Sequence, residues 1–276
     1  MKRLNVMVNG LPGNMAQIVV GHILADDRFE LIPFSLTGPE ILDREFTVRN
    51  STVKLVQPDH KEPAIIEIKK SGENVFSVDF THPSAVNSNA VFYCKFNVPF
   101  VMGTTGGDRR QLEETVVSSS IAAVVAPNMA KQIVGFQAMM DFAASTFPGL
   151  FNGYSLEIEE SHQKGKADTS GTAKAMVRYF NKLGVPFSEK DIIKVRDPRI
   201  QASQWGIPEA YLNGHGWHTY SLLSEDQTVR FSFSHNVNGR DVYAKGTLDA
   251  LVYLSKKIGE GAAGKMYTMI DVLKGT

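Results

Sequence analysis

The sequence predicts an α/β protein, with a Rossmann-like, doubly wound parallel sheet in the first half and an α+β domain with an open, mostly antiparallel sheet in the second. Three observations predict this fold. Up to Asn128, short apolar strands alternate with helical patterns, whereas after Asn128 three helical patterns accompany three longer strand patterns. With 276 residues and 43% hydrophobic residues, the chain is also long enough for two domains.

The first strand and the first helix flank a glycine turn. Apolar residues alternate over residues 4–8, the turn GLPGNMA follows, and apolar residues recur at helical spacing over residues 16–24. A second strand is predicted over residues 30–36. Alternating strands and helices indicate parallel strands joined by right-handed crossovers. The remaining strands and helices of this half are predicted over residues 75–80, 85–96, 98–102, 109–118 and 122–126.

The second half begins with a helix predicted over residues 130–147. A further helix is predicted to begin near Thr172. The last segment, residues 246–273, is helical and apolar on one face, so we expect it to pack back on the first domain. The strands of this half are predicted over residues 154–160, 215–223 and 228–237.

Composition limits the partners of the chain. Lys and Arg (29) balance Asp and Glu (29), so no net field attracts a nucleic acid or a membrane surface, and we expect neither as a partner. The single cysteine, Cys94, excludes an intramolecular disulfide and suits a reducing compartment. Because the first residues run directly into a strand, we expect a cytoplasmic protein, or one of the plastid stroma whose transit peptide has been removed.

The turn GLPGNMA holds part of a dinucleotide-binding fingerprint. In G-x-G-x-x-G, glycines allow a tight turn and close approach of the backbone to pyrophosphate. Only Gly10 and Gly13 are present, with Ala16 at the third position, so an ordinary strand-to-helix turn is an alternative interpretation. Later strand ends favour a nucleotide, because doubly wound sheets bind ligands beyond the carboxyl ends of their strands. These ends carry Phe80-Thr81, Gly103-Thr104-Thr105-Gly106 and Pro127-Asn128-Met129.

The end of the second predicted strand bears on the choice of cofactor. An NAD-selective site usually has Asp or Glu there, about 20 residues after the glycines, to bind the ribose diol. This sequence has Ser35, Leu36 and Thr37 instead, so the 2′-phosphate of NADPH is not repelled and two hydroxyls can donate to it. We therefore expect NADPH as the preferred cofactor, with NADH also possible. Alternatively, both hydroxyls simply belong to a polar loop entry.

The segment ESHQKGKADTSGT, residues 160–172, carries the main catalytic pattern. The helix that follows would be capped by one residue of Asp168–Ser170, and its free N–H groups suit a carboxylate. His162 can donate a proton near neutral pH, and Lys166 can stabilise a developing negative charge. This spacing fits a small dicarboxylate facing a proton donor. A solvated basic loop is the alternative.

Other His and Glu residues are weaker candidates. His215 and His218 are three apart in a predicted strand and so point to opposite faces, which argues against a shared metal, and we expect no metal site. Glu159 and Glu160 are neighbours in a strand and make a poor catalytic pair for the same reason.

Taken in order, the motifs GLPGNM, DFTHPSAV, GTTGGD, APNM, ESHQKGKADTSGTA and HNVNGRDVYAKGTLDA resemble those of the dihydrodipicolinate reductases. ESHQ, PFVMGTTGGD and the ending GRDVYAKGTLDA resemble the plant-type branch most. The resemblance extends from Val6 to about Leu273. It implies hydride transfer from NADPH or NADH to the cyclic dicarboxylate 4-hydroxy-tetrahydrodipicolinate, with loss of its hydroxyl as water, in lysine and diaminopimelate biosynthesis.

The resemblance also implies roles for individual residues. His162 is the implied proton donor and Lys166 the second catalytic residue. The implied substrate contacts are Ser170, Gly171 and Thr172, and Gln163 can also bond a carboxylate. Together, the resemblance and the strand ends give these expected cofactor contacts: Gly10, Leu11, Pro12, Gly13, Asn14, Met15, Ser35, Thr37, Phe80, Thr81, Gly103, Thr104, Thr105, Ala126, Pro127, Asn128 and Met129.

Two departures from the common bacterial pattern concern substrate affinity and cofactor choice. That pattern has a second histidine after the catalytic one, where this chain has Gln163, which cannot carry charge. It also has an arginine at the end of the second strand, where this chain has Ser35 to Thr37.

The expected domains follow from the motifs. Residues 1–128 would bind the dinucleotide, with residues 241–276 packing back on them, and residues 129–240 would bind the substrate and assemble a homotetramer, as the resemblance implies. Two alternatives remain: a reductase of another small cyclic imine or carbonyl acid, and a non-catalytic NADPH sensor. A substrate panel separates the first, and the presence of both His162 and Lys166 argues against the second.

Overall fold

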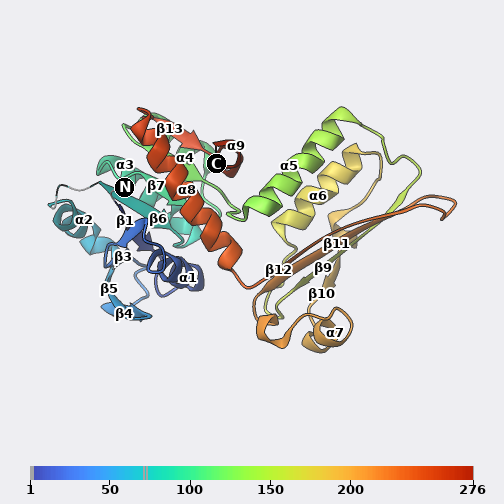
Figure 1. Cartoon of the computed structure of the whole chain (residues 1–276), viewed down its shortest axis with the longest axis horizontal. Coiled ribbons are helices and arrows are strands. Elements are labelled where there is room, and N and C mark those ends of the chain that lie inside the picture. The colour runs from blue at the N-terminus through green and yellow to red at the C-terminus, as the bar shows by residue number, and fades with distance from the viewer. Residues whose placement is uncertain (1–2, 71, 73, 276) are drawn as a thin grey trace. The chain divides into compact units, whose positions relative to one another are not determined.

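The computed structural model describes residues 3–70, 72 and 74–275, which form two compact units. The first unit runs up to Lys131 and resumes at Asp241, and the second unit is Gln132–Arg240 (Figure 1). The second unit is therefore an insertion into the first. The functions assigned to the two predicted domains stay predictions.

A six-stranded parallel sheet forms the centre of the first unit. Its strand order is β13-β8-β7-β6-β1-β2, and every neighbouring pair is parallel. The predicted Rossmann-like class is thus confirmed. The strands are β1 (Leu4–Asn9), β2 (Phe29–Leu31), β6 (Val75–Asp79), β7 (Phe100–Met102), β8 (Ala122–Val125) and β13 (Lys265–Tyr267).

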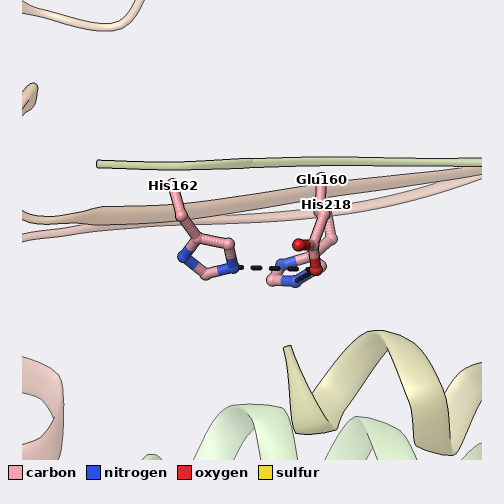
Figure 2. Close-up of side chains that lie close together, drawn as sticks. All are labelled: Glu160, His162 and His218. Carbon is pink, nitrogen blue, oxygen red and sulfur yellow. Dashed lines mark ion pairs between the residues drawn. The ribbon is translucent and has the colours of Figure 1, made fainter. Parts of the chain in front are cut away.

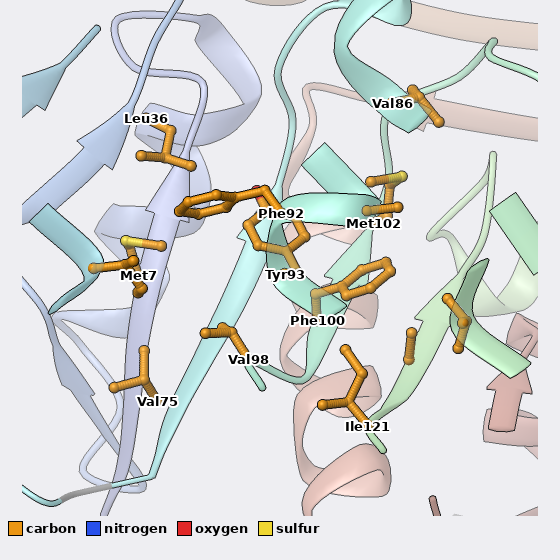
Figure 3. Close-up of a cluster of buried hydrophobic side chains, with 14 of the residues drawn as sticks. Met7, Leu36, Val75, Val86, Phe92, Tyr93, Val98, Phe100, Met102 and Ile121 are labelled. Carbon is orange, nitrogen blue, oxygen red and sulfur yellow. The ribbon is translucent and has the colours of Figure 1, made fainter. Parts of the chain in front are cut away.

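Helices cover both faces of this sheet. On one face, apolar side chains of the sheet and of three helices form a buried cluster that includes Met7, Tyr93 and Phe100 (Figure 3). Val6 and Val8 point away from that cluster and are equally buried. Strands buried on both faces are mostly apolar, and the central strands follow this rule except at a few buried polar residues such as Asn9 and Asp79. The three helices are α2 (Lys61–Lys69), α3 (Val86–Lys95) and α4 (Arg109–Val117).

The other face is covered by helices from both ends of the chain. α1 (Asn14–Ile23) packs against α8 (Asp241–Gly259), and α8 also packs on β7 and β8. The final helix, α9 (Met269–Gly275), packs on α8. The C-terminal segment therefore packs back on the first unit.

The strand predicted over residues 30–36 is in fact two strands. β2 stays in the main sheet, whereas β3 (Phe34–Leu36) pairs with β5 (Ser51–Val56), which also pairs with β4 (Glu45–Val48). The resulting three-stranded sheet, of order β3-β5-β4, was not predicted. Pro33 separates β2 from β3, because proline has no N–H to donate to a ladder.

The helix predicted over residues 246–273 is also wrong in part. β13 interrupts it and adds an edge strand beside β8. A strand of three residues is too short to show an alternating pattern.

The second unit contains a mixed sheet of order β10-β9-β11-β12, in which only β10 and β9 are parallel. The predicted open, mostly antiparallel sheet is thus confirmed. α5 (Lys131–Thr146) and α6 (Gly171–Lys182) lie side by side over one face, where they enclose Ile158 and Tyr220 (Figure 1). The other elements are β9 (Ser155–His162), β10 (Ile193–Val195), α7 (Pro198–Ser203), β11 (His215–Leu223) and β12 (Arg230–Asn238).

None of the helices formed by the described residues has the length and apolar character that crossing a bilayer requires.

Candidate active site

The turn between β1 and α1 forms one wall of a cavity of about 710 Å³ in the first unit. This volume lies within the range of small-molecule and cofactor pockets. The loop after β3 and the end of β6 form other parts of the wall. The predicted cofactor contacts that line the cavity are Gly10, Leu11, Pro12, Gly13, Thr37, Phe80 and Thr81.

The glycine turn packs closely on the end of β6. Gly10 has a φ of +105°, and a Cβ there would lie 2.2 Å from the carbonyl oxygen of Phe80, so only glycine fits. α1 begins at Asn14, and its N-cap residue, Gly13, has no side chain that could bond the first N–H groups of the helix. These N–H groups remain for an anion such as pyrophosphate.

Ser35 and Thr37 support this turn. The N–H of Leu11 donates to Oγ of Ser35 (3.2 Å), and the Thr37 hydroxyl donates to the carbonyl oxygen of Leu11 (2.8 Å). Ser35 is fully buried, whereas Thr37 reaches the cavity wall. Their hydroxyls therefore hold the turn in place, and a direct contact with the cofactor stays a prediction.

Two charged residues on the cavity wall bear on cofactor choice. Glu40, in the loop after β3, and Lys61, at the start of α2, both line the cavity. A carboxylate can bind a ribose diol and repels a 2′-phosphate, whereas an ammonium group attracts a phosphate. The sequence expectation considered only the end of the strand and missed Glu40.

A buried carboxylate, Asp79, holds two of the residues that line the cavity. Asp79, at the end of β6, accepts hydrogen bonds from the Tyr93 hydroxyl (2.7 Å), the Asn89 amide (3.0 Å) and the Thr104 hydroxyl (2.7 Å). It also accepts the Thr81 N–H (3.1 Å) and hydroxyl (2.8 Å). Burial, together with the charge of Asp79, raises the pKa of Tyr93 well above its ordinary value, so its hydroxyl stays a donor. This network fixes Thr81 and Asn89, which line the cavity.

The other predicted cofactor contacts follow neighbouring strands of the same sheet. β7 and β8 lie beside β6, so the segments after them reach the same carboxyl edge. Gly103 faces the Phe80 ring, since a Cβ there would lie 2.2 Å from Cε1. The cofactor roles of these residues stay predictions. The predicted contacts outside the cavity lining are Asn14, Met15, Ser35, Gly103, Thr104, Thr105, Ala126, Pro127, Asn128 and Met129.

In the second unit, three strands bring a carboxylate and three imidazoles to one face of the sheet. The register places Glu160 of β9 opposite His218 of β11, and His218 opposite His235 of β12. His162 is two residues beyond Glu160 and so shares its face. The ring centroid of His218 lies 5.1 Å from that of His162 and 4.6 Å from that of His235. Figure 2 shows Glu160, His162 and His218 converging.

Glu160 is the centre of this cluster. Its fully buried carboxylate accepts a bond from Nη2 of Arg196 (2.5 Å) and from the N–H of Ser170 (3.0 Å). Nε2 of His218 and Nε2 of His162 lie 3.7 and 3.9 Å from its Oε2 (Figure 2). Burial by itself would raise the pKa of Glu160, but the contacts with His218, Arg196 and Ser170 outweigh burial and lower that pKa to about 2. The carboxylate is therefore ionised at neutral pH.

The tautomer of His162 follows from its surroundings. Nδ1 lies 3.0 Å from the carbonyl oxygen of His215, which can only accept, so Nδ1 carries the proton of the neutral ring. Nε2 has no hydrogen-bond partner within the described part of the chain and faces Glu160. Burial, assisted by His218 and opposed by Glu160, lowers the pKa of His162 to about 4. His162 is therefore neutral at pH 7 in the free protein.

Arg196 also holds the loop that carries Lys166. Its Nε donates to the carbonyl oxygen of Lys166 (2.8 Å) and its Nη2 to that of Asp168 (3.4 Å). The Lys166 ammonium group contacts the Asp168 carboxylate at 2.8 Å, but that side chain is 76% exposed. An ion pair so exposed is weak, so Lys166 can exchange this partner for a ligand.

Ser170 is the N-cap of α6, one of the three residues expected to cap it. Its Oγ accepts the N–H of Ala173 (3.1 Å) and lies 2.9 Å from Nε2 of His218, while its own N–H donates to Glu160. The polar atoms of Ser170 are thus engaged within the protein. The N–H groups of Gly171 and Thr172, in the first turn of α6, remain for a carboxylate. Binding of substrate by Gln163, Ser170, Gly171 and Thr172 stays a prediction.

The cluster also has the residue types of a metal site. One ligand atom each of Glu160, His162 and His218 lies within 4.8 Å of the others, a set that could hold a cation. The guanidinium group of Arg196 and the N–H of Ser170 already bind the same carboxylate and would compete with a metal ion. We therefore interpret the cluster as a hydrogen-bonded acid–base group.

Four residues of this cluster were not among the predicted site residues: Glu160, His218, His235 and Arg196. The two members of the pair His215 and His218 do face opposite ways, since Nε2 of His215 lies 2.9 Å from the Ser161 hydroxyl. The register that places His218 opposite Glu160 cannot be read from local sequence patterns. A glutamate two residues before the candidate histidine, on the same face of the strand, was the available signal.

Comparisons with known proteins identify relatives over the whole chain. The family model described as dihydrodipicolinate reductase, N-terminus, matches residues 4–129, and the model for its C-terminus matches residues 133–273. A probable 4-hydroxy-tetrahydrodipicolinate reductase 1, chloroplastic, of Oryza sativa subsp. japonica is 45% identical, over 98% of this chain and 78% of its own length. The 4-hydroxy-tetrahydrodipicolinate reductase 1, chloroplastic, of Arabidopsis thaliana is 44% identical, over 98% of this chain and 78% of its own.

A solved structure shares the fold. Dipicolinate-bound dihydrodipicolinate reductase from Paenisporosarcina sp. TG-14 superposes with a TM-score of 0.68 at 20% identity, over 97% of this chain and 98% of its own. At this identity the likeness concerns the fold alone.

Proposed function

This chain belongs to the dihydrodipicolinate reductase family, and from that premise we propose that it reduces 4-hydroxy-tetrahydrodipicolinate to tetrahydrodipicolinate with loss of water, in lysine and diaminopimelate biosynthesis. The observation that carries this proposal is the match of both family models, which together span residues 4–129 and 133–273. The reaction consumes one hydride and one proton and releases the hydroxyl of the substrate as water.

The cofactor is a nicotinamide dinucleotide, which supplies the hydride when bound. The glycine turn from Gly10 to Gly13, the free N–H groups at the start of α1 and the cavity beside them support its binding. We propose that NADPH is preferred and that NADH is also used. Lys61 favours the 2′-phosphate and Glu40 opposes it, so the chain has groups that act in each direction.

We assign the proton and charge steps to the second unit. His162 donates the proton from Nε2, which faces Glu160, once that nitrogen is protonated. Lys166 stabilises negative charge on the substrate, because its contact with exposed Asp168 is easily exchanged. The N–H groups of Gly171 and Thr172 bind one carboxylate of the substrate, and Gln163 contacts the other.

A coupled assay tests this function. A synthase would generate the cyclic intermediate from pyruvate and aspartate semialdehyde, while absorbance follows oxidation of NADPH and, separately, of NADH. Oxidation that depends on the synthase supports the reductase, and the ratio of the two rates measures cofactor preference. Tight NADPH binding without oxidation would favour an NADPH sensor, and oxidation only with other cyclic imines or carbonyl acids would favour another substrate.

The role of Lys166 has a direct test. Lys166→Ala should lower turnover by about 100-fold, the scale of a lost electrostatic contact in a transition state, and leave the dissociation constant for NADPH unchanged. Lys164→Ala is the matched control, because Lys164 lies exposed in the same loop. Equal losses of turnover and of NADPH affinity in Lys166→Ala would contradict the assignment.

We also propose a homotetramer assembled through the sheet of the second unit. We propose a location in the plastid stroma, since the plant relatives are named chloroplastic, or in the cytoplasm. β12 supports the assembly, because it is an edge strand with exposed side chains such as Phe231, which is 41% exposed. Light scattering of the purified protein measures the number of chains.

A further inference from the structure

One carboxylate connects the two groups that the proposed function places around the substrate. Oε2 of Glu160 accepts the N–H of Ser170, immediately before α6, and the same oxygen lies 3.9 Å from Nε2 of His162. We propose that Glu160 is a positioning residue of the reaction, which holds the start of α6 in place and stabilises the donated proton on Nε2 of His162. This proposal rests on the proposed function, since it takes His162 as the proton donor.

The geometry fixes both roles of Glu160. Nδ1 of His162 is committed to the carbonyl oxygen of His215, so an additional proton can enter only at Nε2, which faces the carboxylate. Arg196 holds the other oxygen of Glu160 and keeps the carboxylate from rotating. The carboxylate of Glu160 therefore fixes the position of the start of α6 relative to Nε2 of His162.

The groups around His162 have opposite effects on a proton at its ring. Arg196 and His218 disfavour a positive imidazole, whereas Glu160 and the carbonyl oxygen of His215 favour it. His235 lies one ring further along the row, beyond His218. Glu160 is thus a negative charge that offsets the positive charge of Arg196 beside the ring.

Proton uptake follows from this arrangement. Because His162 is neutral in the free protein, it must gain a proton before it can donate one. A ligand with two carboxylates adds negative charge beside the ring and favours that gain, with Glu160 already in place on the other side. Binding of a dicarboxylate should therefore take up a proton from solution.

The experiment uses the whole protein and pyridine-2,6-dicarboxylate as the probe. Calorimetric titrations with this probe at pH 7, in the presence of NADPH and in two buffers of different ionisation enthalpy, measure the protons taken up. The wild-type protein should take up close to one proton, and Glu160→Gln only a small fraction of one. Glu160→Gln should also lower kcat by about 100-fold, as expected for impaired acid catalysis, with the KM for NADPH changed less than twofold.

Matched variants separate positioning from folding. Glu159→Gln changes the neighbouring, partly exposed residue on the other face of β9 and should resemble the wild type in every measurement. Glu160→Asp keeps the charge and should recover proton uptake. His218→Asn removes a ring that competes for Glu160 and should raise the pKa of the alkaline limb of the kcat profile, on which His162 loses the proton that it donates. Glu160→Gln should lower that pKa by at least about one unit. General destabilisation does not produce shifts of opposite sign.

Specific outcomes overturn the proposal. Unchanged proton uptake in Glu160→Gln, or shifts of the same sign in Glu160→Gln and His218→Asn, would exclude the assigned role. If Glu160→Gln does not fold, the direction of the shift in His218→Asn decides alone. Absence of synthase-dependent turnover in the wild-type protein would instead contradict the proposed function, and the two failures are thereby distinguished.

Discussion

The hydroxyl of Tyr93 belongs to the hydrogen-bond network of Asp79 in the first unit. It donates to the buried carboxylate of Asp79 (2.7 Å) and accepts from the Asn9 amide (2.9 Å). Tyr93→Phe removes both bonds and leaves the apolar packing of the ring, including its contact with Phe100, in place. Asp79 keeps its bonds to Asn89 and to the threonines, so the network is weakened rather than lost.

The expected loss of stability follows from the bonds removed. A hydrogen bond to a charged group contributes about 1.5–3 kcal/mol, so Tyr93→Phe should lower the free energy of unfolding by about 2 kcal/mol. For a chain of this size, that corresponds to a fall in Tm of about 4–8 °C in differential scanning calorimetry. Because the pKa of Tyr93 is raised, the loss should be the same at pH 6.5 and pH 9.

Tyr253→Phe is the control for this change. Tyr253 is also buried in the first unit, but its ring packs on Tyr267 and no hydrogen bond of its hydroxyl is found among the described residues. This variant should change Tm by less than about 1 °C. A Tyr93→Phe protein as stable as Tyr253→Phe would refute the view that the Asp79 network depends on the Tyr93 hydroxyl.

Three further predictions concern packing, pH and cofactor choice. Gly246→Ala should lower the free energy of unfolding in urea by more than about 3 kcal/mol, because its Cβ would lie 1.8 Å from the carbonyl oxygen of Met129. The control Gly259→Ala, in the same helix, places its Cβ in open space and should be neutral or stabilising. Burial lowers the pKa of His235 to about 4, so the folded protein binds fewer protons than the unfolded chain below pH 6.5. The contribution of neutral His235 to the free energy of unfolding is therefore fully present above pH 6.5 and should fall as the pH drops to 4. In a series of urea midpoints against pH, His235→Gln should reduce this fall by on the order of 2 kcal/mol. Glu40→Gln should raise the ratio of NADPH to NADH activity several-fold and Lys61→Ala should lower it, and an unchanged ratio in both would place the 2′-phosphate elsewhere.

The sequence predicted the parallel sheet because its strands are short apolar runs separated by glycine turns and amphipathic helices. It failed where an element was too short to show a period, as in β13, or where Pro33 divided one apolar run into two strands. Both failures concern pairing partners, which local patterns do not contain.

The candidate site likewise contains residues that local patterns indicate and residues that only strand pairing brings together. His162 and Lys166 could be named as candidates because they stand in one segment with a helix start, and their roles stay predictions. Glu160, Arg196 and His218 come from three separate strands or their ends, and only the sheet register brings them together. Glu40 was missed because it lies in a loop beyond the strand end, where its side chain lies beside Gly38 at the cavity wall.

The insertion of the second unit has a consequence for proteolysis and complementation. The chain leaves the first unit near Lys131 and returns to it in α8. The ion pair of Lys131 with Asp249 (2.6 Å) and the close approach of Gly246 to Met129 hold these two segments together. α8 and β13 also contribute a layer and an edge strand to that unit. A cut anywhere within Gln132–Arg240 would thus yield two fragments that remain associated, and the segments before and after the cut should reassemble the first unit when expressed as separate chains.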